Sequence, residues 1–249
     1  MERTTILERM KQLHLFGMYR CFQTNLNTNH PESLTGDELI EMLIEAEWDE
    51  RQTRKIDRLM RIAKFRYKAS AEEIIFNDKR NLDKNQIMRF AECDYIKQKQ
   101  NILITGSTGV GKSYLASALG HQACLMGYRV MYFNMSKILS KFKMHKADGS
   151  YIKEISKIEK QDLLILDDFG LQPIDNQGIL IFMEMIEDRY DRKSTIMTSQ
   201  LPVSSWYEVI NEKTIADAIL DRLVHSSHRI DLKGESLRKS KKEANINMN

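Results

Sequence analysis

The segment Asn101–Ser113, NILITGSTGVGKS, joins a short apolar run to a glycine-rich turn. The turn, Gly106–Ser113, fits G-x-x-x-x-G-K-[ST], in which backbone amides surround phosphate oxygens, a lysine reaches the outer phosphates and a hydroxyl reaches magnesium. The apolar run predicts a strand, and the residues from Lys112 to about Met126 predict a helix that Gly127 ends. An accidental glycine turn is the alternative, which this strand–loop–helix context disfavours.

Each position of the turn then has an expected role. Lys112 would contact the β and γ phosphates, and Ser113 would bind magnesium. The phosphates would lie at the N-terminus of the following helix. The expected nucleotide-binding residues are Gly106, Ser107, Thr108, Gly109, Val110, Gly111, Lys112, Ser113 and Tyr114.

Further apolar runs alternate with helical patterns on the C-terminal side of this motif, which predicts a parallel five-stranded α/β sheet. The runs are RVMYF (129–133), DLLIL (162–166), STIMT (194–198) and RIDL (229–232).

LLILDDFG, residues 163–170, has two acidic residues, Asp167 and Asp168, at the end of its predicted strand. Asp167 suits the magnesium shell, and Asp168 suits the orientation or deprotonation of an attacking water. Paired acids that simply cap the next turn are the weaker alternative.

The nucleotide is expected to be ATP. DDFG satisfies a D-x-x-G pattern of GTP-binding proteins and contains the D-F-G of protein kinases, but the N-K-x-D and H-R-D motifs that these classes require are absent. Thr198, Ser199 and Gln200 end another strand and could sense the γ phosphate, or simply form a turn. Arg222, near the end of IADAILDRL, fits either a catalytic role or a surface ion pair.

Composition limits the protein class. The chain has 249 residues, 42% hydrophobic and 29% charged, enough for one large domain and a small one. No stretch approaches the roughly 18 apolar residues of a membrane span, and the N-terminus, MERTTILERMKQ, is too charged for a secretory signal, so we expect a cytoplasmic protein without a membrane partner. The three cysteines are widely spaced and fit no disulfide framework.

An all-helical domain is predicted over residues 1–78. Residues 4–26 show a helical rhythm with a break at Gly17. Thr35–Glu38 has the spacing of a capping box before a long helix, and Ser70-x-x-Glu73 predicts the start of another short helix. We expect a linker and lead-in helix at 79–98, the α/β domain at 99–238 and a flexible tail at 239–249.

The order GSTGVGKS, LLILDDFG, TSQLP, then LDRL followed by HRIDLKGESLRKS, resembles the IstB-like transposition helper ATPases. These are relatives of the DnaC helicase loaders and DnaA initiators in the AAA+ class. The resemblance covers nearly the whole chain, including LHLFGMYRCF near the N-terminus. It implies an AAA+ sheet with little or no C-terminal lid, and self-assembly with Arg222 acting on a neighbour's ATP. It also implies a γ-phosphate contact in cis by Arg238.

Two basic runs are candidate DNA contacts. Between Arg51 and Lys68 there are eight basic residues against one acid, Asp57. Arg51, Arg54, Arg58 and Arg61 recur there at helical spacing, and a second run after the 129–133 strand supplies Lys137, Lys141, Lys143 and Lys146. Basic helix faces of this kind can bind the phosphates of a DNA backbone, although a helix face that is simply exposed to solvent is the ordinary alternative.

The motifs predict an ATP- and Mg²⁺-dependent ATPase, and the resemblance implies that it self-assembles on double-stranded DNA, with active sites shared between subunits. Its expected role is to assist a cognate transposase by selecting or remodelling target DNA and stimulating transposition. A replicative helicase loader of the DnaC type is the alternative, because its ATPase core would look similar. A scaffold that binds ATP without turnover is a further alternative, against which the doubled aspartate argues.

Overall fold

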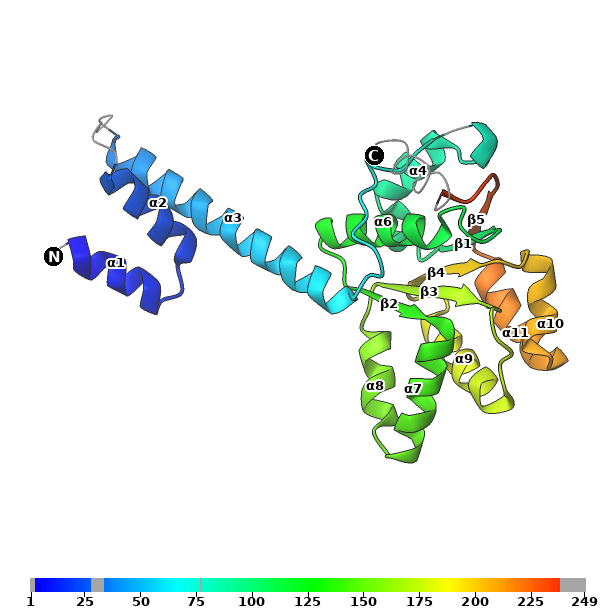
Figure 1. Ribbon diagram of the computed structural model, residues 1–249. Helices are drawn as coiled ribbons and strands as arrows, with labels where there is room; N and C mark the ends of the chain where they lie inside the picture. Colours follow the sequence, from blue (N-terminus) through cyan, green and yellow to red (C-terminus); the bar gives the residue numbers. More distant parts are fainter. Residues whose placement is uncertain (1–2, 28–33, 77, 238–249) are drawn as a thin grey trace, which may run out of the picture. The chain divides into compact units, whose positions relative to one another are not determined.

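The computed structural model describes residues 3–27, 34–76 and 78–237, which form two compact units (Figure 1). The units are Met1–Arg58 and Leu59–Asn249, so the division falls inside one helix, α3 (Gly36–Ala63). We expected the boundary at residue 78. The contacts divide the chain earlier because Ala63, Ala69 and Ile74 are buried in the core of the second unit.

The first unit contains α1 (Arg3–Gln12), α2 (Phe16–Asn27) and the greater part of α3. The predicted capping box begins α3: Thr35 Oγ1 accepts a hydrogen bond from Glu38 N at 3.3 Å, and the Glu38 carboxylate accepts from Thr35 N at 2.7 Å. Two donors that a helix start leaves unpaired are thereby satisfied.

The predicted break at Gly17 is wrong in position. Residues 13–15 form the turn between α1 and α2, with His14 at φ 57°, and Gly17 lies inside α2. A Cβ on Gly17 would stand 2.2 Å from the carbonyl oxygen of Ala46 in α3. The Glu47 carboxylate also accepts from Gly17 N at 2.8 Å and from Met18 N at 3.3 Å. The glycine therefore permits close helix packing and does not break the helix.

The second unit is built on a five-stranded, fully parallel sheet in the order β2-β3-β4-β1-β5, as the sequence predicts. The strands are β1 (Asn101–Gly106), β2 (Val130–Asn134), β3 (Leu163–Phe169), β4 (Ser194–Ser199) and β5 (Ser227–Leu232). The connecting helices are α6 (Lys112–Leu125), α7 (Met135–Ala147), α8 (Tyr151–Glu159), α9 (Asn176–Arg189), α10 (Trp206–Ile210) and α11 (Lys213–Val224).

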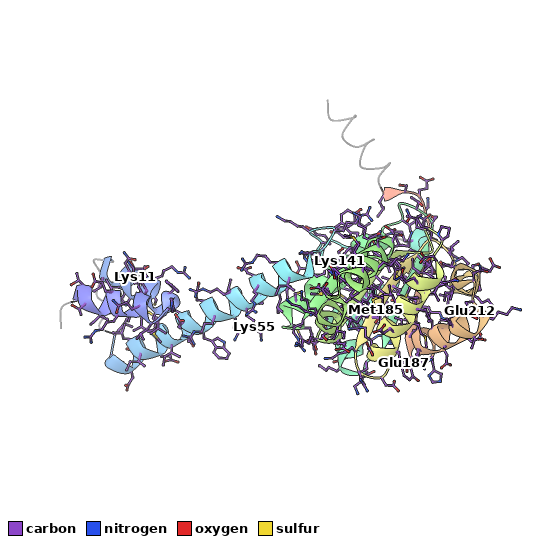
Figure 2. All side chains as sticks on the ribbon, turned by 90° about the horizontal axis from the view of Figure 1, so that it is seen from below. Lys11, Lys55, Lys141, Met185, Glu187 and Glu212 are labelled. Atoms are coloured by element: carbon purple, nitrogen blue, oxygen red, sulfur yellow. The ribbon has the colours of Figure 1, made fainter. Side chains whose placement is uncertain are left out.

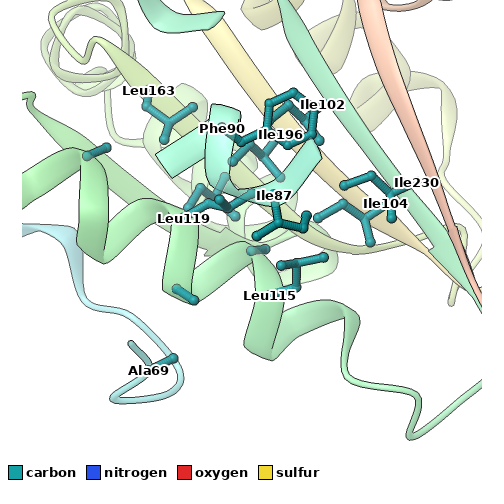
Figure 3. Packing of buried hydrophobic residues seen from close by; sticks show 14 of the residues in the cluster. Ala69, Ile87, Phe90, Ile102, Ile104, Leu115, Leu119, Leu163, Ile196 and Ile230 are labelled. Atoms are coloured by element: carbon teal, nitrogen blue, oxygen red, sulfur yellow. The ribbon is translucent and has the colours of Figure 1, made fainter. Parts of the chain in front are cut away.

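Alternate strand residues enter two separate cores, because successive side chains of a strand point to opposite faces. Ile102 and Ile104 of β1 pack with Leu115 and Leu119 of α6, whereas Leu103 packs on the face covered by α7, α9 and α11. Figure 3 shows the first core, where α4 (Lys84–Ala91) adds Ile87 and Phe90. With both faces covered, the carboxyl edge is the open place for a ligand.

The helix predicted to start at Ser70 is absent, and this prediction is wrong. Residues 70–73 form a turn, in which Glu73 N donates to the Ser70 carbonyl at 3.3 Å. The Glu73 carboxylate accepts from the Tyr114 hydroxyl at 2.6 Å instead of capping a helix.

The predicted lead-in helix is divided into two helices, α4 and α5 (Asp94–Lys97), with Cys93 at φ 60° between them. A 3₁₀ turn, Asp78–Arg80, precedes both. Among the described residues, the helices are too short or too polar to cross a membrane.

Candidate nucleotide site

The glycine-rich loop joins β1 to α6 through three glycines with positive φ: 140° at Gly106, 87° at Gly109 and 99° at Gly111. Side chains rarely adopt these backbone angles. A Cβ on Gly106 would also stand 2.2 Å from the Leu232 carbonyl oxygen, and one on Gly109 would stand 2.2 Å from Ser236 Oγ. Space and backbone angle therefore both require glycine at these two positions.

Two segments distant in sequence support the loop. Leu237 N donates to the Gly109 carbonyl at 3.0 Å, and the buried Arg80 donates to the Val110 carbonyl at 2.7 Å. Lys233 N in turn donates to the Arg80 carbonyl at 3.1 Å. Residues 234–237, GESL, therefore lie against the phosphate loop and help to hold its backbone in place. Arg238 lies outside the described residues, so its role in cis stays a prediction.

Lys112 begins α6 and is only 6% exposed. Its ammonium group donates to the carbonyls of Gly106 and Ser107, both at 2.8 Å, so the charge is held inside the loop. Thr108 reaches across to the end of β4, where its hydroxyl donates to Gln200 Oε1 at 2.7 Å. The helix N-terminus and the lysine together make a positive site that suits phosphate.

Asp167 is fully buried at the end of β3. Its carboxylate accepts from the Ser113 hydroxyl at 2.8 Å and also from the hydroxyls of Tyr132 and Thr198. Burial and the neighbouring Asp167 raise the pKa of Tyr132, which keeps that hydroxyl a donor. An anionic oxygen beside a serine hydroxyl suits a hard divalent cation such as Mg²⁺.

Asp168 follows at φ 63° and lies at the irregularity where β3 carries one more residue than β4 between two paired positions. Its backbone N–H donates to Thr198 Oγ1 at 3.1 Å, and its carboxylate accepts from Asn134 Nδ2 at 3.1 Å. Arg66 Nη1 stands 3.0 Å from Asp168 Oδ2 and 3.3 Å from Asp167 Oδ2. Because of this bulge, the side chains of the consecutive residues Asp167 and Asp168 can both lie at the same site and need not point to opposite faces of the sheet.

The structure thus brings Lys112, Ser113, Asp167, Asp168 and Thr198 together at the carboxyl edge. Four residues of this region are absent from the sequence-based set: Arg66, Arg80, Tyr132 and Asn134. Tyr132 and Asn134 could have been found from the strand order, because Asn134 pairs in register with Asp167. Arg80 belongs to no motif, and Arg66 lies in the basic run proposed for DNA, so only the tertiary structure places either residue at this site.

Arg222 lies elsewhere in the unit. Asn101, the first residue of β1, donates to the Arg222 carbonyl at 3.3 Å, which places this arginine at the amino edge of the sheet. Its Nε stands 2.6 Å from Oε2 of Glu187 on the surface of α9, a residue labelled in Figure 2. Its guanidinium carbon lies 5.7 Å from the Tyr190 ring centre. Within one chain, Arg222 and the two aspartates therefore occupy opposite edges.

The predicted DNA contacts lie on α3 and α7, and several have acidic or aromatic neighbours. On α3, Arg51 pairs with Glu47 at 2.8 Å, and Arg54 pairs with Glu50 at 2.6 Å. Arg58 and Arg61 follow on the same helix and are exposed. The lysines of α7 also have neighbours of these kinds. Lys141, labelled in Figure 2, is 3.6 Å from Glu154, and Lys143 is 2.6 Å from Asp175. Lys146 lies 4.5 Å from the Tyr151 ring centre, and Lys137 lies in the first turn of the helix.

Comparisons with known proteins find relatives over nearly the whole chain. The model of the family described as IstB-like ATP binding protein matches residues 8–245. An insertion sequence ATP-binding protein of Sinorhizobium fredii is 42% identical over 95% of this chain and 96% of its own length. The IS21 ATP-binding protein of Pseudomonas aeruginosa is 28% identical over 98% of this chain and 92% of its own length.

Two solved structures share the fold. The DnaC helicase loader matches with a TM-score of 0.55 at 18% identity, over 67% of this chain and 98% of its own. AMPPCP-bound DnaA from Aquifex aeolicus matches with a TM-score of 0.57 at 19% identity, over 73% of this chain and 56% of its own. At such identities the likeness establishes the AAA+ fold alone.

Proposed function

The chain belongs to the family of IstB-like ATP-binding proteins, and from that premise we propose that it assembles on double-stranded DNA with ATP and assists the transposase of an insertion sequence. It is an AAA+ ATPase. The proposed contribution is to select or remodel target DNA and so stimulate transposition. This proposal is supported mainly by the similarity, over nearly the whole chain, to insertion sequence ATP-binding proteins. It is also supported by a site whose residues, such as Ser113 and Asp167, suit Mg²⁺ and ATP.

The residues present fit ATP with Mg²⁺. The loop amides and Lys112 would hold the phosphates, and Ser113 with Asp167 would hold the metal ion, which supplies charge neutralisation at the phosphates when bound. Asp168 would orient or deprotonate the attacking water. Thr198 contacts both aspartates, through the Asp167 carboxylate and the Asp168 amide, and would keep their relative position fixed.

Assembly would complete the site. Arg222 stands at the amino edge of its own sheet, away from the aspartates at the carboxyl edge, so a role at a phosphate requires a second chain. A guanidinium supplied by the neighbour would stabilise charge that develops during phosphoryl transfer. It would first have to leave Glu187, which is half exposed.

DNA binding would use the basic residues of α3 and α7. Asn134 connects the second helix to the site, because its side chain accepts from Lys137 N at 3.3 Å as the N-cap of α7 and donates to Asp168. A shift of α7 on DNA would therefore move a hydrogen-bond partner of Asp168. This contact supports a coupling between DNA binding and hydrolysis.

The test is a reconstituted reaction with the transposase of the same insertion sequence and a target plasmid. We expect strand transfer to rise at least about tenfold when the chain and ATP are both present, which corresponds to about 1.4 kcal/mol of activation free energy. ADP in place of ATP is the control, and sedimentation with duplex DNA should show large complexes with ATP only.

Strand transfer that is unchanged by the chain, despite ATP-dependent assembly on DNA, would contradict the transposase role. Stimulated loading of a replicative helicase in the same preparation would then favour the helicase-loader alternative.

A further inference from the structure

The backbone at Arg66 is held near the two aspartates by the packing of its neighbours in the chain. It follows the end of α3 at Ala63, on a segment that packs into the core of the second unit. The Phe65 ring centre lies 4.4 Å from that of His121, and the Tyr67 ring centre lies 6.3 Å from that of Tyr114. With both flanking residues packed, the Arg66 side chain is aimed at the edge of the sheet.

A single nitrogen of Arg66, Nη1, serves both carboxylates, at 3.3 Å from Asp167 and 3.0 Å from Asp168. Asp167 is fully buried, and a buried carboxylate needs a compensating charge. Arg66 is itself 43% exposed on its side chain, so it can swing towards solvent without breaking the core. The contact is thus both favourable and reversible.

The same carboxylate would receive the divalent cation. Ser113 and Asp167 are already within hydrogen-bond distance of each other, and Mg²⁺ prefers such oxygens. A guanidinium and a dication that bind one carboxylate at close range repel each other. Entry of the metal ion therefore opposes the position that Arg66 occupies.

We propose that Arg66 is a positioning residue that neutralises Asp167 and Asp168, competes with Mg²⁺ for these two carboxylates and moves away from them when Mg²⁺ binds. The inference rests on the proposed metal site at Ser113 and Asp167, but not on the proposed roles in DNA binding or transposition.

The test compares Arg66→Gln with the wild type by Mg²⁺ titration of a fluorescent ADP analogue, without DNA. Glutamine keeps a polar side chain and removes the charge. We expect the half-saturating Mg²⁺ concentration to fall about two- to fivefold, the scale of one partly exposed ion pair. Affinity for the analogue in EDTA should stay unchanged, and Arg66→Lys should behave more like the wild type.

Arg129→Gln is the matched control. Arg129 is 51% exposed on its side chain and pairs with Asp162 at 3.2 Å in the same unit, and it lies outside the proposed site. Its loss should leave the Mg²⁺ dependence unchanged.

A second readout uses the metal ion alone. Without nucleotide, Arg66→Gln should melt at a lower temperature than the wild type, and added Mg²⁺ should raise its melting temperature more than that of the wild type. An equal or higher half-saturating Mg²⁺ concentration in Arg66→Gln would overturn the proposal, as would a lower melting temperature with the same response to Mg²⁺. Should the wild type bind no analogue, the nucleotide site itself would be in error, and the response to Mg²⁺ alone would still decide the role of Arg66.

Discussion

At the scale of the residue, Lys112 is the strongest test of the nucleotide site. Its ammonium group is buried inside the loop and held by two carbonyls at 2.8 Å. Lys112→Ala removes the positive charge that faces the phosphates, so we expect ATP binding to fall below detection in titration calorimetry. Lys213→Ala, at the exposed start of α11, is the control and should bind ATP normally. Equal affinities of the Lys112 variant and the wild type would refute the assignment.

At the scale of the element, the basic face of α3 predicts a salt-dependent contact with DNA phosphates. Arg54 also stacks on Phe16 at 4.5 Å, so its removal would disturb the packing of the first unit. We expect Arg58→Gln with Arg61→Gln, which leaves Arg54 in place, to weaken binding to all duplex sequences and to reduce the salt slope by up to about two units. The measurement is fluorescence anisotropy over a range of salt concentrations.

The control for this element removes the same charge elsewhere. Arg192→Gln with Lys213→Gln changes two exposed positions of the second unit and should leave the slope as it is in the wild type. An identical slope in all three proteins, with helix content preserved, would mean that the α3 face is only solvated.

At the scale of the whole molecule, the separation of Arg222 from the aspartates predicts active sites that form between chains. Asp168→Asn and Arg222→Ala should each be nearly inactive alone. Mixed in equal amounts, they should recover roughly a quarter of wild-type ATP hydrolysis on duplex DNA, since a quarter of random junctions pair an intact Asp168 with an intact Arg222. Labelled variants must first be shown to enter the same assemblies. Recovery no greater than the sum of the separate activities would exclude an arginine acting in trans.

The sequence by itself determined the features that depend on neighbouring residues. The strand before the phosphate loop, the helix after it, the five strands and the capping box at Thr35 are all confirmed. Each arises from periodicity, from glycine conformation or from a hydrogen bond over three residues, and such causes are visible in a short window. The paired aspartates were recognisable because an apolar strand leads directly to them.

Only the tertiary structure decided which distant groups meet. Gly17 marks close packing of α2 on Ala46, and Glu73 bonds Tyr114 instead of starting a helix. Arg66 reaches Asp167 across 101 positions of sequence, and Tyr132 reaches it because β2 lies beside β3. A local pattern cannot express these choices, because a side chain takes the partner that the folded chain brings within hydrogen-bond distance, and that partner is set by strand order and packing.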